Sequence, residues 1–164
     1  MFVLGIDPGL TVTGYGFVRR TRTLEAVAAG VIRTDPDVET SARLLELHRI
    51  LSALIAEHRP QVVAIEQVFT NRNRHSAIGV GRAAGVAMLA AAQSDLKVHE
   101  YAPTVVKSAI TGDGRADKKA VQRMVARRLN LSDLPRPVDA ADALAVAVCH
   151  IQSLAAALDR VGAR

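Results

Sequence analysis

The fold is decided near the N-terminus by the stretch Phe2-Val3-Leu4-Gly5-Ile6-Asp7-Pro8-Gly9. Its short, partly β-branched apolar run predicts a buried strand over residues 2–7, and Pro8-Gly9 predicts a turn directly after it. A second run of this kind, Val62-Val63-Ala64-Ile65-Glu66, follows a predicted helix. We therefore expect it to lie parallel to an earlier strand through a crossover connection. If the two strands are neighbours, both end on a carboxylate at one edge of the same sheet.

Outward from these two runs, the chain alternates between strand and helix patterns. The residues between about 20 and 23 join two strands as a hairpin, and leucines at helical spacing predict an amphipathic helix from about 40 to 57. The predicted strands are 2–7, 13–20, 23–33, 62–66 and 97–101, and the predicted helices are 40–57, 75–93, 103–110, 117–129 and a last one after Pro137. This order predicts an α/β fold with a five-stranded mixed sheet, three antiparallel strands then parallel strands, flanked by helices. One domain over 1–158 is expected, with a frayed tail over 159–164.

Composition narrows the class of protein. The chain has 164 residues, 49% of them hydrophobic, which is compatible with one folded domain and argues against intrinsic disorder. A net charge of +5, carried mostly by arginine, favours an anionic partner. Cys149 is the single cysteine, so an intrachain disulfide is impossible and a reducing, cytoplasmic location is expected. We expect no membrane segment, because the apolar run Ala83–Ala92 is shorter than the roughly 18 residues that a span needs.

Four acids stand in apolar surroundings: Asp7, Glu66, Asp139 and Asp142. Taken singly, each has an ordinary explanation. Asp7 precedes Pro-Gly, which is common turn chemistry, and Glu66 could reach water from a strand end. Asp139 and Asp142 open a helix, where acids complement the macrodipole, although the alanines around them would let that helix lie close to another element.

Together the four acids indicate a metal site. Carboxylates within about 4–6 Å of one another do not all stay ionised unless a cation compensates them. Oxygen ligands favour Mg²⁺ or Mn²⁺, and two such ions can activate water against a phosphodiester. The sequence shows no motif for a covalent nucleophile, which leaves metal-activated water as the expected attacking group.

Four motifs in order then identify a resemblance. They are Gly5-Ile6-Asp7-Pro8-Gly9 with Thr13-Gly14-Tyr15-Gly16, Ile65-Glu66-Gln67-Val68-Phe69 with Asn73, Gly112 to Lys118, and Asp139-Ala140-Ala141-Asp142-Ala143-Leu144-Ala145. The sequence resembles the RuvC family of Holliday junction resolvases, in the ribonuclease H-like superfamily, from Val3 to about His150. It departs from the family pattern at Arg82, Ala84 and Ala120, which puts details of dimer or DNA contacts in doubt.

The resemblance implies a homodimeric nuclease that nicks two opposing strands of a four-way DNA junction, in recombination and DNA repair. It implies two Mg²⁺ ions per active site, or Mn²⁺ in their place, held by the four acids. Lys118 matches a lysine near the scissile phosphate, and Lys107 matches another basic residue close to the DNA. A partner branch-migration motor, RuvA with RuvB, is also implied. The further candidate DNA-binding residues are Phe69, Arg72, Asn73, Arg74, Arg115 and Lys119.

Two of these features have an alternative explanation. Phe69 lies in a basic loop and matches an aromatic that stacks on bases, but a loop phenylalanine can also tuck into the core. The glycine- and alanine-rich helix 75–93 is suited to a dimer interface, and equally to close packing on its own sheet. The five histidines show no metal-ligand spacing and are read as ordinary residues.

Three other classes of protein share some of these sequence features. An actin-like ATPase or sugar kinase also opens with an Asp-x-Gly strand and hairpin, but such proteins usually need two domains of this kind. A non-catalytic nucleic-acid-binding module gives no reason for four acids that face a polyanion. A ribonuclease H-like enzyme that processes RNA is closest to the favoured prediction, and the Phe69 loop with the aspartate pair favours the junction resolvase.

Overall fold

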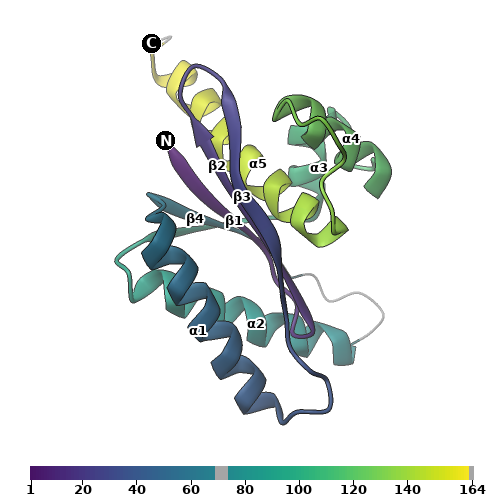
Figure 1. The fold of residues 1–164 in the computed structure, drawn as a ribbon. Helices are drawn as coiled ribbons and strands as arrows, with labels where there is room; N and C mark the ends of the chain where they lie inside the picture. The colour runs from purple at the N-terminus through teal and green to yellow at the C-terminus, as the bar shows by residue number, and fades with distance from the viewer. Residues whose placement is uncertain (69–73, 163–164) are drawn as a thin grey trace.

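The computed structural model describes residues 1–68 and 74–162, without the side chains of 74–76 and 156–162 (Figure 1). The observed bounds agree with the predicted ones within two residues. In chain order the elements are β1 (Phe2–Asp7), β2 (Val12–Arg20), β3 (Leu24–Arg33), α1 (Thr40–His58), β4 (Val62–Glu66), α2 (Arg74–Ala92), β5 (Lys97–Tyr101), α3 (Pro103–Thr111), α4 (Lys118–Arg128) and α5 (Val138–Gly162).

The five strands form one mixed sheet in the order β3-β2-β1-β4-β5. The first three strands are antiparallel, whereas β4 lies parallel to β1 and β5 lies parallel to β4. Ile6 on β1 is opposite Ile65 on β4, so the carboxyl ends of these two strands lie side by side. The predicted sheet is confirmed, including the adjacency of the strands that end at Asp7 and Glu66.

Helices cover both faces of the sheet (Figure 1). On one face, α1 and α2 enclose a core that includes Leu47, Leu51 and Ala87. On the other face, α5 lies along β1 and β2, with α3 and α4 beside it. Each fully buried leucine or valine stabilises the fold by about 1.5–3 kcal/mol relative to an exposed one. Because both faces of the sheet are packed in this way, the strands that carry the site are held in place.

Helix α5 rests directly on the backbone of the sheet because glycines line its path. A Cβ atom added to Gly5 would overlap the carbonyl oxygen of Ala143, and one added to Gly14 would overlap that of Asp139. A Cβ on Gly16 would lie 2.9 Å from Leu144 Cγ. Only glycine allows the helix this close, so these glycines set the depth at which the first turn of α5 meets the strand ends.

The apolar character of α5 has to be explained, because its Val138–Ala155 window has a mean hydropathy of 1.3 over 18 residues. By length and composition alone this window could cross a membrane, and it is longer than the Ala83–Ala92 run on which the sequence-based expectation rested. However, 61% of it is buried inside the domain, against the sheet. Its hydropathy is therefore that of a central core helix.

At its C-terminal end, α5 remains helical to Gly162. The predicted fraying of the tail from Asp159 stays a prediction.

Candidate active site

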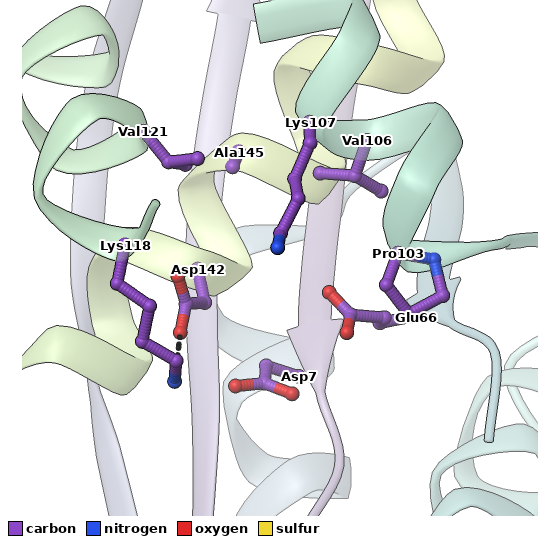
Figure 2. A pocket seen from close by; sticks show the side chains of 9 residues that line it. All are labelled: Asp7, Glu66, Pro103, Val106, Lys107, Lys118, Val121, Asp142 and Ala145. Carbon is purple, nitrogen blue, oxygen red and sulfur yellow. Dashed lines mark hydrogen bonds and ion pairs between the residues drawn. The ribbon is translucent and has the colours of Figure 1, made fainter. Parts of the chain in front are cut away.

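Asp7 and Glu66 end neighbouring parallel strands, where functional sites of open α/β sheets are expected. Their main chains are fixed by the ladders of a five-stranded sheet, and both residues are half-buried. Figure 2 shows the two carboxylates facing the same cavity. The sheet therefore fixes their separation, and side-chain rotation is the main freedom that remains.

The aspartates of α5 reach this edge from the other layer. Asp7 pairs with Gly14 across β1 and β2, and Gly14 in turn contacts the backbone of Asp139. Asp142, one turn further along, lines the cavity together with Asp7 and Glu66, and its side chain is 17% exposed. Asp139 does not line the cavity, but its charge acts on Asp7. The small residues of the helix thus bring Asp142 to the cavity, whereas the sequence predicted that both aspartates face inward.

The cavity has a volume of about 120 Å³ and is open to solvent. Three acids and two lysines converge on it: Lys118 of α4 lies beside Asp142, and Lys107 of α3 points towards the space between Asp142 and Glu66 (Figure 2). Four apolar residues complete its walls: Pro103, Val106, Val121 and Ala145. Opposite charges around an open cavity make a site that can hold both a cation and an anionic group.

Lys118 is joined to the acids by an ion pair, with its Nζ atom 3.2 Å from Asp142 Oδ2. It is the first residue of α4, whose N-cap residue Asp117 accepts a hydrogen bond of 2.6 Å from the backbone N–H of Ala120. Asp142 in particular raises the pKa of Lys118, so the ammonium stays charged. Because 72% of the lysine side chain is exposed, this pair contributes little to stability. Its consequence is a fixed positive charge at the rim of the cavity.

Burial of the acids, followed by their mutual repulsion, dominates the electrostatics of the cavity. Burial raises the pKa of Asp7 to about 8, with further contributions from the charges of Glu66, Asp142 and Asp139, and with Lys118 opposing them. Burial and Asp142 also raise the pKa of Glu66. Without a cation, Asp7 therefore retains at neutral pH a proton that an aspartate in water would lose. A divalent cation would remove the repulsion and displace that proton.

The donor set fits a hard divalent cation, because every acid supplies carboxylate oxygens and no soft ligand faces the cavity. Among the described side chains, no three acidic, histidine or cysteine groups lie close enough together to hold a metal ion in their present arrangement. The acids line an open cavity instead. An open site leaves room for solvent and substrate, as catalytic metal sites do.

Several predicted DNA-binding residues lie away from the cavity. Arg115 and Lys119 are exposed, and the backbone N–H of Arg115 is held by Asp113 Oδ1 at 2.9 Å. Neither residue lines the cavity. Arg74 is the first residue of α2, and its side chain is outside the described part of the chain. Phe69, Arg72 and Asn73 also lie outside the described residues.

His150 belongs to the core, in agreement with its interpretation as an ordinary residue. It is 1% exposed, and its Nδ1 atom lies 2.7 Å from the hydroxyl of Tyr101 at the end of β5. Burial lowers its pKa to about 4, so the ring is neutral at physiological pH. It therefore ties α5 to the edge strand and does not line the cavity.

The family model described as "Crossover junction endodeoxyribonuclease RuvC" matches residues 3–150 of this chain. The chain belongs to the RuvC family. A RuvC protein of Salinispora arenicola is 51% identical over 168 aligned positions, which cover 98% of this chain and 96% of the relative. One of Syntrophomonas wolfei is 47% identical, with 93% and 90% covered. The family predicted from the sequence motifs is confirmed.

Solved structures agree with this assignment. RuvC of T. thermophilus, in complex with a Holliday junction substrate, superposes with a TM-score of 0.87 at 36% identity, covering 92% of this chain and 93% of that one. The yeast mitochondrial resolvase Ydc2 gives a TM-score of 0.63 at 14% identity, which concerns the fold alone. The ribonuclease H-like fold and the endonuclease class are confirmed. RuvC enzymes are metal-dependent nucleases, which excludes the kinase and the non-catalytic binding module.

Proposed function

We propose that this RuvC-family chain resolves four-way DNA junctions by paired symmetric nicks, with Mg²⁺ or Mn²⁺ held at the acids of the cavity. The observation that carries the proposal is the convergence of Asp7, Glu66 and Asp142 with Lys118 around one open cavity at the sheet edge. Asp7 and Glu66 come from the sheet, Asp142 comes from α5, and Lys118 comes from α4. This arrangement suits a site that binds cations and a phosphodiester together.

Two Mg²⁺ ions per active site are proposed, with Asp7, Glu66, Asp139 and Asp142 as their ligands. The cations would supply water of lowered pKa and would stabilise negative charge on the phosphate. Asp142 lines the cavity and Asp139 does not, so Asp142 is the aspartate of α5 that is better placed for direct ligation. Asp139 would then act as a ligand only after its side chain turns towards Asp7.

The protein itself supplies positive charge to the substrate. Lys118 carries its ammonium at the rim of the cavity and would leave Asp142 for the scissile phosphate once cations neutralise the acids. Lys107 faces Glu66 from α3, and its charge opposes the raised pKa of that carboxyl. We propose that Lys107 contacts the cleaved DNA strand next to the scissile phosphate. Phe69 would stack on unpaired bases at the junction centre, with Arg72, Asn73, Arg74, Arg115 and Lys119 contacting the surrounding backbone.

Paired nicks require two active sites, and we propose that a homodimer supplies them. Helix α2 buries Ala83, Ala87 and Ala90 within its own domain, which accounts for one of its faces. On another side, a Cβ on Gly81 or Gly85 would meet nothing within 4 Å. Leu89 is exposed by 52% on the same helix. This exposed small and apolar face would pack on its copy, and sedimentation that shows only monomer at micromolar concentration would contradict the dimer.

A cytoplasmic location and a partnership with the RuvA–RuvB branch-migration motor complete the proposal. The family membership supports both, and a reducing compartment suits a chain whose single cysteine is buried and free.

The proposed substrate is tested by direct competition. With Mg²⁺, equal amounts of a four-way junction, a linear duplex of the same sequence and an RNA–DNA hybrid are incubated with the protein. We expect paired nicks at symmetric positions in the junction and intact duplex and hybrid. Cleavage of the hybrid in preference to the junction would favour the RNA-processing alternative, and equal cleavage of plain duplex would contradict junction selectivity.

A further inference from the structure

A second cavity, of about 450 Å³, lies between the start of α1 and the first half of α2. Its polar walls are Thr11, Thr40, Arg43 and Arg82, and Leu10 and Ile78 are among its apolar ones. It is separate from the acid cavity and shares no residue with it. Two arginines and no acid line this space, so its chemistry is that of an anion site.

Arg43 is the central residue of this cavity because it is only 7% exposed. Its Nε atom donates to Thr34 Oγ1 at 3.0 Å, and its Nη2 atom donates to Thr11 Oγ1 at 2.9 Å. The Thr34 hydroxyl in turn donates to the carbonyl oxygen of Leu10. Both acceptors are neutral hydroxyls, so they orient the guanidinium without neutralising its charge.

The charge of Arg43 has no counter-ion in the described part of the chain. The one ion pair among those residues joins Lys118 to Asp142. The segment 69–73 contains no acidic residue that could supply a partner. A guanidinium has five N–H donors, and two of them are used by the threonines, which leaves three. A buried, unpaired charge costs several kcal/mol, so an anion that enters the cavity would be bound strongly.

Arg82 adds a second positive charge from α2 and is exposed. It is one of the residues at which this chain departs from the family pattern. The cavity also lies next to the acid site along the chain, because Thr11 stands four residues after Asp7 in the loop that joins β1 to β2. Four residues span at most about 14 Å, so the loop keeps Thr11 within that distance of Asp7.

We propose that Arg43 and Arg82 form a binding site for a backbone phosphate of the junction DNA, next to the catalytic cavity. The inference rests on the proposed function for the identity of its ligand. A planar guanidinium held in place by two hydroxyls presents its remaining N–H groups as a fork, which matches phosphate oxygens. The site fixes the position of the strand on the protein and reads no base.

The test measures junction binding in EDTA, where no cleavage occurs, over salt concentrations from about 50 to 250 mM. Arg82→Gln removes one charge from an exposed position and leaves the threonine network intact. Arg49→Gln is the matched control, because Arg49 is an exposed arginine of α1 that does not line the cavity. Arg43→Gln is the second variant, and its melting temperature shows whether the loss of the network has unfolded it.

We expect Arg82→Gln to bind the junction roughly tenfold more weakly at low salt, with an unchanged melting temperature. The slope of log K against log salt should fall by about 1 in magnitude, as expected for one lost phosphate contact. Arg49→Gln should match the unmodified protein. A folded Arg43→Gln should show the same loss of slope as Arg82→Gln.

An unchanged salt slope in Arg82→Gln overturns the inference, and two further measurements then identify the true ligand. Weaker dimerisation of the variant in sedimentation would indicate a carboxylate from a second copy of the chain. Thermal stabilisation by inorganic phosphate at matched ionic strength, lost in Arg82→Gln, would indicate a free anion. Cleavage by the unmodified protein is scored separately, so failure of the proposed function and failure of this site are distinguishable.

Discussion

Replacing Asp7 by asparagine should stabilise the metal-free protein at alkaline pH while removing a ligand from the site. The pKa of this carboxyl is about 8 in the folded protein and 3.8 in its ordinary state. A carboxyl whose pKa is raised by folding stabilises the folded state below its ordinary pKa, and that contribution is lost as the pH rises to the folded value. The stability of the unmodified protein should therefore fall between about pH 4 and pH 8, and asparagine should remove this fall.

The magnitude follows from the size of the shift. One pKa unit corresponds to about 1.4 kcal/mol, so a shift from 3.8 to about 8 corresponds to roughly 6 kcal/mol as an upper limit. Water and salt reach this half-buried carboxylate and screen it from Glu66 and Asp142, so we expect a gain of about 2 kcal/mol or more. For a chain of this length, that gain raises the melting temperature by roughly 4–8 °C.

Thermal unfolding in EDTA, from about pH 5 to pH 9, measures the effect. The difference in melting temperature between Asp7→Asn and the unmodified protein should widen with pH and level off above about pH 8. Asp37→Asn is the control, because Asp37 is exposed and lies in the turn before α1. Added Mg²⁺ should narrow the difference, since a cation at 100 times its dissociation constant stabilises the folded unmodified protein by about 2.7 kcal/mol. A stability difference that stays constant with pH, or equal stabilisation of both proteins by Mg²⁺, would show that Asp7 is neither destabilised by its charge nor a cation ligand.

Two more predictions concern the geometry and the chemistry of the site. Gly5→Ala places a methyl group against the carbonyl of Ala143 and should destabilise the fold by about 3 kcal/mol in urea titration. Gly79→Ala, at a helical position where the added methyl group meets only Leu10 at 3.5 Å, should stabilise the fold by up to about 1 kcal/mol. Similar values for the two would contradict the close approach of α5 to the sheet. Lys118→Met should reduce single-turnover junction cleavage by about 10²- to 10³-fold, with Lys119→Met close to the unmodified rate, and equal losses in both would show that Lys118 contributes only to general attraction of the DNA.

The framework of the site could be predicted from sequence because its signals are local. Short apolar runs that end at Asp7 and Glu66 predicted both strands, and the intervening helix predicted that the strands are parallel. Helical spacing placed Asp139 and Asp142 on one helix end. What these signals could not supply is the depth at which α5 meets the sheet. That depth depends on the contact of Gly5 with Ala143, a non-local fit that neither segment reveals alone.

The buried arginine was missed for a related reason. Arg43 lies on the same helix face as the buried Leu47, Leu51 and Ile55, four residues apart in each step. That spacing is compatible with burial. However, an arginine at the end of an apolar stripe usually packs its aliphatic part along the core and keeps its guanidinium in solvent. Its burial depends on Thr11 and Thr34, which come from other parts of the chain.

The central claim is that the acids at the ends of β1, β4 and α5 form one catalytic site for junction DNA. It is tested most directly by single-turnover cleavage of a four-way junction with Mg²⁺, at saturating protein, for the unmodified chain and Asp7→Asn. We expect paired, ligatable nicks by the unmodified chain, and full binding of the junction without nicks by Asp7→Asn. Nicking by Asp7→Asn at a rate close to that of the unmodified chain would contradict the claim.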